Sequence, residues 1–352
     1  MSRITSVHAV LPPHRHTQQE VTDVVARTCL PPGRDRGVLD RLHANAGVRA
    51  RHTALPLDRY AELSDFGAVN DAFIESALDL GAEAIRGALD RAGLSPTDVN
   101  LLLFTSVTGI AAPSVDARLV GRLGLRPDVK RLPVFGLGCV AGAAGIGRLH
   151  DYLRGWPDHV AVLLSVELCS LTFQRNDDSM ANLVASALFG DGAAAVVACG
   201  AQRAVDAAGP EVVAARSRLY PDTERVMGWD VTSTGFRVVL GSGVPEVVRR
   251  YLADDVDGFL AEHGLARDDV TGWVCHPGGP RVLEAVAETL GLPLRALDVT
   301  RKSLAEKGNL SSSSVLHVLR DTLDGAPPPP GTPGLLLALG PGFCSELVLL
   351  RW

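Results

Sequence analysis

The stretch PVFGLGCVAGAAGIG, residues 133–147, is the most informative part of the sequence for the fold, because a predicted strand and a predicted helix meet within it. Its first residues close a strand-like run, and the small residues from Cys139 onward open a predicted helix. A cysteine at a helix N-terminus faces free backbone N–H groups and the positive end of the helix dipole, which favours the thiolate. Cys139 is therefore a candidate nucleophile, with an inert buried cysteine in tight helix packing as the alternative.

Outward from this stretch, two types of segment alternate along the first half of the chain. Short aliphatic runs predict buried strands, and segments with apolar residues at helical spacing predict helices. Such alternation predicts parallel strands with covering helices, and so an α/β fold. The expected strands are 99–107, 130–136 and 159–167, and the expected helices are 75–93, 114–124, 139–156 and 178–189.

The second half has its own version of this alternation, so we predict two domains of the same general plan, 1–200 and 201–352. No residue-level repeat relates them, and the duplication rests on the pattern alone. The Pro-rich stretch at 325–334 lacks backbone donors and predicts a surface loop. Strands are expected at 237–243, 272–276, 334–340 and 345–351, and helices at 245–263, 280–291 and 311–323.

Composition excludes several classes of protein. The 352 residues carry a formal net charge of −6, which argues against a protein that grips nucleic acid or an anionic membrane. No apolar run approaches the ~18 residues needed to span a bilayer, and the first residues do not resemble a signal peptide, so we expect a cytoplasmic protein. The six cysteines form no CxxC pair, which predicts free thiols and no metal site.

Two further residues stand where an α/β fold builds sites. His276, in CHPGGP, ends a strand-like run, so its imidazole is expected at the carboxyl edge of a sheet. Asn309, in GNLSSSSV, precedes a predicted helix. Taken singly, they read as an ordinary histidine and a turn residue. Together, Cys139, His276 and Asn309 supply a nucleophile, a base or imidazole donor, and an amide donor.

Papain-like proteases use the same three residue types in the same order. Their cysteine lies near the mature N-terminus, whereas more than a hundred residues of α/β pattern precede Cys139. The protease reading is therefore disfavoured.

Five motifs give the sequence a closer resemblance. It is similar to the type III polyketide synthases, the chalcone-synthase superfamily within the thiolase fold, and most of all to bacterial alkylresorcinol and alkylpyrone synthases. The resemblance implies a five-layer α/β/α/β/α fold, two pseudo-duplicated halves with mixed sheets, and a homodimer. HPGGP is the most specific motif, because ketoacyl-synthase III enzymes usually carry HQAN there. The motifs are GLGCVAGAAG at Cys139, SALFGDGAAAVV at Phe189, CHPGGP at His276, GNLSSSSV at Asn309, and GPGF at 340–343.

The resemblance also implies a reaction. Cys139 attacks an acyl-CoA thioester and holds the starter, while His276 and Asn309 hydrogen-bond the malonyl-CoA carbonyl as carbon dioxide leaves. The resulting carbanion attacks the bound acyl group in a Claisen condensation, and the cycle repeats before ring closure. The partners are then malonyl-CoA and acyl-CoA, with no cofactor and no acyl-carrier protein.

Several pocket residues follow from the same resemblance. Phe189 and Phe236 correspond to two gatekeeping phenylalanines between the CoA tunnel and the reaction cavity. Arg49 and Arg51 fall where relatives place basic residues against CoA phosphates. The other implied cavity residues are Thr108, Ala112, Glu167, Cys169 and Ser311.

Residue size at these positions bears on the substrate. Ala112 stands where plant enzymes have Met, and this smaller group favours a medium or long fatty acyl starter with two or three extensions, giving a resorcinol or pyrone. A malonyl-primed tetrahydroxynaphthalene-type synthase is the alternative, with which Cys169 is compatible. Val107 replaces a Thr that directs aldol closure in plant enzymes, so aldol and lactone closure both stay open. A ketoacyl-synthase III and an inactive scaffold homologue are the remaining alternatives.

Overall fold

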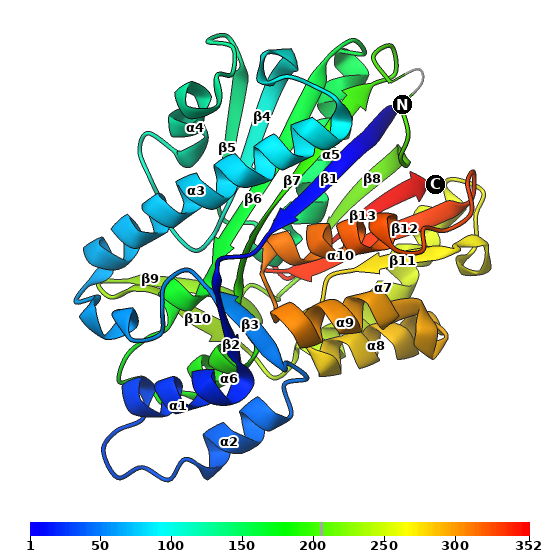
Figure 1. Ribbon diagram of the computed structural model, residues 1–352. Helices are drawn as coiled ribbons and strands as arrows, with labels where there is room; N and C mark the ends of the chain where they lie inside the picture. The colour runs from blue at the N-terminus through cyan, green and yellow to red at the C-terminus, as the bar shows by residue number, and fades with distance from the viewer. Residues whose placement is uncertain (205–206) are drawn as a thin grey trace.

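The computed structural model describes residues 1–204 and 207–352 (Figure 1). Among these residues, nine strands form one mixed sheet in the order β11-β12-β13-β8-β1-β7-β6-β4-β5. The first half supplies β1 (Ser2–Val10), β4 (Val99–Thr105), β5 (Lys130–Val134), β6 (Val160–Leu168) and β7 (Asp191–Gly200). The second half supplies β8 (Glu211–Leu219), β11 (Gly272–Cys275), β12 (Pro333–Gly340) and β13 (Cys344–Arg351).

Each half contains parallel and antiparallel neighbours, as the resemblance implied. Strand β4 runs parallel to β5 and β6, whereas β7 is antiparallel to β6 and β1. In the second half β11 and β12 are parallel, and β13 is antiparallel to both β12 and β8. The halves join where β1 meets β8, over two residue pairs only, Ser2 with Val212 and Arg3 with Glu211. The two expected sheets are therefore continuous at a short seam.

Helices complete a five-layer α/β/α/β/α arrangement, which confirms the predicted fold class (Figure 1). One pair covers the outer face of the first half, a second pair lies between the two halves, and a third covers the outer face of the second half. In that order the pairs are α3 (Phe66–Ala92) with α4 (Val115–Leu123), α5 (Ala141–Gly155) with α10 (Ser312–Asp324), and α7 (Val244–Ala261) with α8 (Pro280–Leu290).

Strand β4 shows why the apolar runs are continuous. Leu102 and Phe104 pack in the outer cluster with α3, whereas Leu101 and Leu103 pack in the central cluster with α5. Successive side chains of a strand point to opposite faces of the sheet, so a strand with helices on both faces must be apolar at every position. The aliphatic runs of the sequence thus mark strands buried on both sides.

One strand assignment from the sequence needs correction, and the strand that takes its place in the main sheet was not predicted. The run at 237–243 does not enter the main sheet: it belongs to β10 (Gly235–Leu240), which pairs with β9 (Met227–Thr232) in a separate ribbon. The strand that does enter the sheet is β8. It was not predicted, because its arginines at 216 and 218 interrupt the apolar pattern that marks a strand. Strand β8 is only partly buried along much of its length, so its residues need not be apolar.

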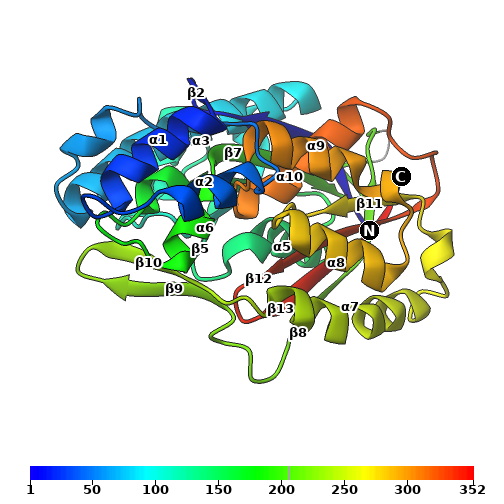
Figure 2. The same cartoon turned by 90° about the horizontal axis from the view of Figure 1, so that it is seen from below.

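Other elements lie around this framework, and several were not expected from the sequence. Helices α1, α2 and α6 pack together at one end of the molecule, with the β9–β10 ribbon beside α6 (Figures 1 and 2). Among the described residues, no helix combines the length and the apolar content that crossing a bilayer requires. These elements are β2 (His14–Thr17), α1 (Gln18–Cys29), α2 (Gly37–Ala44), β3 (Ala50–Thr53), α6 (Met180–Leu188) and α9 (Asp298–Lys307).

Candidate active site

Cys139 lies in a short 3-10 turn, Gly138–Val140, that leads into α5. The turn packs very closely against the strand β12 and the segment that follows it. A Cβ added to Gly138, whose φ is +57°, would lie 2.6 Å from Pro341 Cγ, and a Cβ added to Gly340 would lie 3.0 Å from the Val140 nitrogen. The glycines around Cys139 therefore allow the second half of the chain to approach the nucleophile turn.

His276 follows the last residue of β11 directly, at the carboxyl edge of the parallel pair β11–β12. Its backbone N–H donates to the carbonyl of Leu337, 2.8 Å away, which extends the strand pairing by one residue. The side chain is buried, and its Nδ1 has no hydrogen-bond partner among the described residues. A buried ring nitrogen without a partner is costly unless a ligand or water supplies one.

Asn309 lies between α9 and α10 and is tied to the end of α6. Its N–H donates to the Leu188 carbonyl at 2.8 Å, and its own carbonyl accepts from the Gly190 N–H at 2.9 Å. The side-chain Oδ1 accepts from the Ser311 N–H at 2.9 Å and from the Ser314 hydroxyl at 3.4 Å. Because these bonds hold the oxygen, the amide NH2 is the part of the side chain available to a ligand.

One cavity brings the three residues together. Cys139, His276 and Asn309 line it with Phe189, although they come from three separate segments of the chain. The rest of the lining is mainly aliphatic and aromatic, so polar groups meet a water-poor space there. Such a space strengthens electrostatic interactions with any charge that develops in it.

Burial sets the protonation states of this cavity. It raises the pKa of the Cys139 thiol to about 12, although the thiol also donates a 3.7 Å hydrogen bond to Ser311 Oγ, which works in the opposite direction. It also lowers the pKa of His276 to about 3. Burial therefore opposes the lowering of the thiol pKa that was expected at a helix N-terminus. Both shifts favour the neutral forms of the thiol and the imidazole.

Glu167, at the end of β6, forms a separate buried cluster beside the cavity. Its Oε2 accepts from the Val107 N–H and from Thr108 Oγ1, both at 3.1 Å, and its Oε1 accepts from Ser312 Oγ. Burial raises the pKa of Glu167 to about 7. The neighbouring Ser311 accepts from Cys139, so adjacent serines of the SSSS motif connect the acid cluster with the nucleophile.

Phe236 and Phe189 occupy different surroundings, although the resemblance pairs them as gatekeepers. Phe189 lines the cavity. Phe236 is buried on β10, with its ring 5.4 Å from that of Phe66, and does not line the same cavity. The β9–β10 ribbon reaches the cavity through two other residues, Met227 and Leu240.

Two of the remaining pocket positions also differ from each other. Cys169 opens the 3-10 turn Cys169–Thr172 directly after β6 and is buried, which raises the pKa of its thiol. Ala112 is exposed and lies outside the cavity lining. Its small side chain therefore leaves no additional volume in the cavity of this chain, contrary to expectation.

The two arginines expected at CoA lie in different surroundings. Arg51 is buried, and its Nη1 donates to the carbonyls of Ser186 at 2.7 Å and Phe189 at 2.6 Å. It thus satisfies free carbonyls at the C-terminal end of α6, a structural role that does not fit a contact with CoA. Arg49 has an exposed side chain that lies 3.6 Å from Glu306.

A wide groove adjoins the cavity and is lined by two arginines that were not predicted as site residues from the sequence. The groove has a volume of about 530 Å³ and shares Leu188, Met227 and Gly278 with the cavity. Arg41 of α2 and Arg281 of α8 line it. Arg281 follows the HPGGP motif directly, so its place beside His276 was the signal available in the sequence.

Comparison with known proteins identifies the family. Models of the N-terminal and C-terminal domains of chalcone and stilbene synthases match residues 3–202 and 211–352. The chain belongs to the chalcone and stilbene synthase family. It is a type III polyketide synthase, an acyl-transferring enzyme that condenses malonyl-CoA. Family membership favours this function over the ketoacyl-synthase III and inactive-scaffold alternatives.

Relatives of this type III polyketide synthase include enzymes with stated products. The 1,3,6,8-tetrahydroxynaphthalene synthase of Streptomyces peucetius subsp. caesius is 60% identical over 350 residues, 99% of this chain and 93% of that protein. A putative chalcone synthase of Bacillus subtilis (strain 168) is 35% identical, covering 100% of this chain and 99% of that one. The crystal structure of the tetrahydroxynaphthalene synthase from Streptomyces coelicolor A3(2) matches with a TM-score of 0.93 and 31% identity over 99% of both chains.

Proposed function

We propose that this type III polyketide synthase uses malonyl-CoA as both starter and extender and forms 1,3,6,8-tetrahydroxynaphthalene. The observation that carries the proposal is the 60% identity, over nearly the whole chain, to a synthase of that product. The ten ring carbons of the product equal five two-carbon units, so five malonyl-CoA yield one naphthalene, five carbon dioxide, five CoA and one water. This proposal is preferred to a fatty acyl starter, since Ala112, whose small size favoured that starter, does not line the cavity formed by this chain.

Cys139 and His276 begin the reaction as a neutral pair. As the sulfur attacks the thioester carbonyl, the thiol proton passes to the imidazole, and the CoA thiolate leaves and takes up a proton. Desolvation disfavours both the isolated thiolate and the isolated imidazolium, so the proton moves only when the substrate is in place.

His276 and Asn309 then act on the malonyl thioester. As the bond to the carboxylate breaks, its electron pair becomes the enolate, and the imidazole N–H and the amide NH2 donate to the enolate oxygen. The anchored Oδ1 of Asn309 orients that NH2. Two aimed donors in a water-poor cavity stabilise the developing charge without reorganisation. The enolate carbon then attacks the acyl group on Cys139, which releases the cysteine sulfur.

The groove provides the route for CoA. Arg41 and Arg281 are proposed to pair with CoA phosphates, while the shared wall at Leu188, Met227 and Gly278 leads the pantetheine arm to Cys139. Because CoA thioesters are made in the cytoplasm, we propose that the enzyme acts there.

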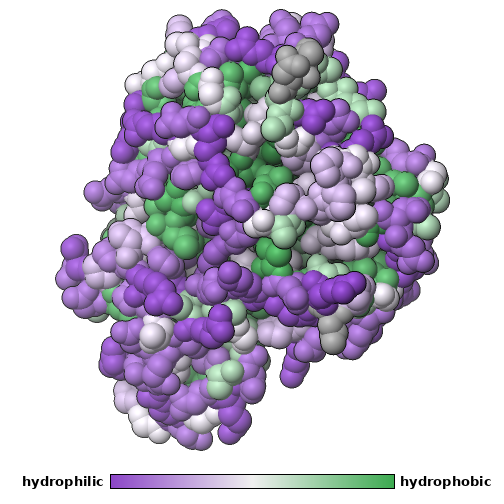
Figure 3. Space-filling model, turned by 45° about the vertical axis from the view of Figure 1, so that its right-hand side comes forward, coloured by the Kyte–Doolittle hydropathy of each residue, from purple (hydrophilic) through white to green (hydrophobic). Residues whose placement is uncertain are grey.

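We also propose a homodimer. Three large apolar residues are exposed by 43 to 52%: Leu132 on the edge strand β5, Phe135 directly after it, and Ile110 in the loop after the neighbouring strand β4. Exposed apolar residues along a sheet edge favour association. Elsewhere, on the face in Figure 3, hydrophilic residues surround small apolar patches. Light scattering during size-exclusion chromatography tests the dimer, and a monomer at micromolar concentration contradicts it.

Product analysis tests the proposed reaction. Purified enzyme is incubated with malonyl-CoA alone and, separately, with acyl-CoA starters of graded chain length, and the products are identified by mass. We expect the naphthalene from malonyl-CoA alone. Products that form only when a long acyl-CoA is present, as resorcinols or pyrones, would contradict the starter assignment and restore the fatty acyl alternative.

A further inference from the structure

The β9–β10 ribbon forms part of the reaction cavity without belonging to the main sheet. Its residues Met227 and Leu240 line the cavity that holds Cys139, and its Phe236 is buried beneath Phe66. Both ribbon views place it beside α6, at the edge of the molecule (Figures 1 and 2). An isolated two-stranded ribbon is only marginally stable by itself, so its position depends on contacts with other segments.

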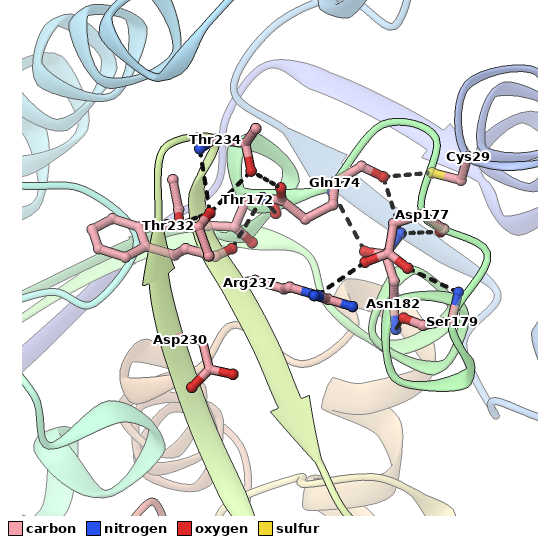
Figure 4. A network of polar contacts seen from close by, with 12 residues as sticks. Cys29, Thr172, Gln174, Asp177, Ser179, Asn182, Asp230, Thr232, Thr234 and Arg237 are labelled. Atoms are coloured by element: carbon pink, nitrogen blue, oxygen red, sulfur yellow. Dashed lines mark hydrogen bonds and ion pairs between the residues drawn. The ribbon is translucent and has the colours of Figure 1, made fainter.

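Gln174 makes the most extensive of these polar contacts. Its Oε1 accepts from the Thr234 hydroxyl at 2.7 Å, at the turn of the ribbon. Its Nε2 donates to two carbonyls, those of Phe236 and Thr172, both at 3.2 Å (Figure 4). The side chain therefore joins the ribbon to the 3-10 turn Cys169–Thr172, using both of its polar atoms.

The backbone of Gln174 is held as firmly as its side chain. Its carbonyl accepts from Asn182 Nδ2 of α6 at 3.0 Å and from Cys29 Sγ of α1 at 3.3 Å, and its N–H donates to Asn182 Oδ1 at 3.4 Å. A second tie joins the same loop to the ribbon, an ion pair of 3.4 Å between Arg237 and Asp177 (Figure 4). Because α1 and α6 hold the loop in place, the side chain of Gln174 fixes the position of the ribbon relative to these two helices.

Resting on the proposed iterative condensation, we propose that Gln174 is a positioning residue that sets the number of extensions. It holds the ribbon so that Met227 and Leu240 keep the cavity at one width while the chain grows. When the ribbon moves outward, water enters and the bound chain is released before the last extension. Gln174 makes three side-chain hydrogen bonds, and water replaces most of them when the ribbon moves outward, so we take their combined net contribution as that of one hydrogen bond. Its loss shifts a two-state population by about fivefold, which is the size of effect expected on the product ratio when the whole side chain is removed.

The test compares Gln174→Leu with Gln19→Leu. Gln19 is an exposed residue of α1 whose Nε2 donates to Asp23 at 3.0 Å, so its replacement also removes a hydrogen bond but leaves the ribbon untouched. Malonyl-CoA is the only substrate, and mass spectrometry gives the ratio of early-released products to the full-length product. This ratio does not depend on how much of the enzyme is folded, so it separates positioning from a general loss of stability.

For Gln174→Leu we expect the share of early-released products to rise about fivefold, while malonyl-CoA decarboxylation per folded enzyme stays within about twofold of wild type. Gln19→Leu should match wild type in both. Thr234→Val, which removes the hydroxyl that bonds Gln174 Oε1 and Thr232 Oγ1, should shift the ratio in the same direction by a smaller factor, whereas Thr234→Ser, which keeps a hydroxyl, should leave the ratio unchanged. Thr234 is exposed, so these variants remain informative if Gln174→Leu does not fold.

Two outcomes overturn the inference. One is an unchanged product ratio in both Gln174→Leu and Thr234→Val. The other is an equal loss of decarboxylation and condensation, which marks a merely structural residue. Failure of the proposed function is recognised separately, because the wild-type enzyme would then make no full-length product from malonyl-CoA.

Discussion

Two groups of buried polar side chains lie side by side in this enzyme and differ in how they are satisfied. Glu167 accepts hydrogen bonds at both carboxylate oxygens, from Val107 N–H and Thr108 on one side and from Ser312 on the other. In the neighbouring cavity, His276 leaves Nδ1 without a partner among the described residues. Buried polar groups that only support the fold are normally satisfied, so an unsatisfied ring nitrogen in a residue that also lines a cavity supports a ligand site there.

Both groups are nevertheless governed by the same desolvation. It raises the pKa of Glu167 and of Cys139 and lowers that of His276, so each group is driven toward its neutral form. The Glu167 cluster and the cavity residues therefore differ in their hydrogen-bond partners and not in their charge. Mutations that remove a partner from one group or a donor from the other test this contrast.

The largest effect is expected for Cys139→Ala. Without a sulfur to hold the acyl group, polyketide formation should fall by about a thousandfold or more, because covalent catalysis is removed. Malonyl-CoA decarboxylation should persist, since His276 and Asn309 remain. Product mass and carbon dioxide release measure the two steps. Cys199→Ala, at a buried cysteine outside the cavity, is the matched control and should retain activity.

Asn309→Asp tests the proposed role of the Asn309 amide as a hydrogen-bond donor separately from its role in the fold. The change keeps an oxygen acceptor for the Ser311 N–H and the Ser314 hydroxyl but removes the NH2. Decarboxylation should fall by about a hundredfold, the usual effect of losing one oxyanion donor. The thermal midpoint, measured by calorimetry, should change little. A variant that decarboxylates at the wild-type rate would show that Asn309 does not contact the enolate.

Glu167→Gln is expected to alter stability as a function of pH. Because the folded-state pKa of about 7 lies above the ordinary 4.5, the folded state binds this proton more tightly, and wild-type stability falls as pH rises from about 4.5 to 7. The variant lacks that loss, so its free energy of unfolding should gain about 3 kcal/mol relative to wild type over that range.

Urea unfolding at pH 5 and pH 7.5 measures the change expected for Glu167→Gln. The comparison is the difference between variant and wild type at each pH, which cancels the titration of all other groups. A constant difference across this range would show that Glu167 titrates normally in the folded protein.

The smallest effect concerns the groove. Arg281→Ala should raise KM for malonyl-CoA about fivefold at low salt, because one charge-assisted contact with CoA phosphate is lost. The effect should shrink at 0.5 M salt, where exposed charges are screened. Arg49→Ala, at an exposed arginine outside the groove, should leave KM unchanged in the same steady-state assay. The opposite pattern would return the CoA site to the region around Arg49.

The contrast between Arg51 and Arg281 shows how far sequence reasoning could go. Both are arginines in the same chain, and only burial distinguishes the one that binds carbonyls of α6 from the one that lines a groove. Exposure is a property of packing between distant segments, and no local pattern encodes it. For the same reason, the sequence could not show that Ala112, whose small side chain was used to infer the starter, lies outside the cavity lining of this chain.

The order of residues predicted the α/β class, most strand and helix positions, and the three polar residues of the cavity, whereas the five-layer arrangement was implied by the resemblance to type III polyketide synthases. Helices and strands are predictable because the apolar patterns with periods of 3.6 and two residues depend only on neighbouring residues. A strand buried on both faces, such as β4, appears in the sequence as a continuous apolar run. Only the tertiary structure decided that β8 enters the sheet in place of the run at 237–243, that Cys139 and His276 are both neutral, and that Gln174 holds the ribbon. These depend on desolvation and on contacts between residues far apart in the chain, which the order of residues alone does not reveal.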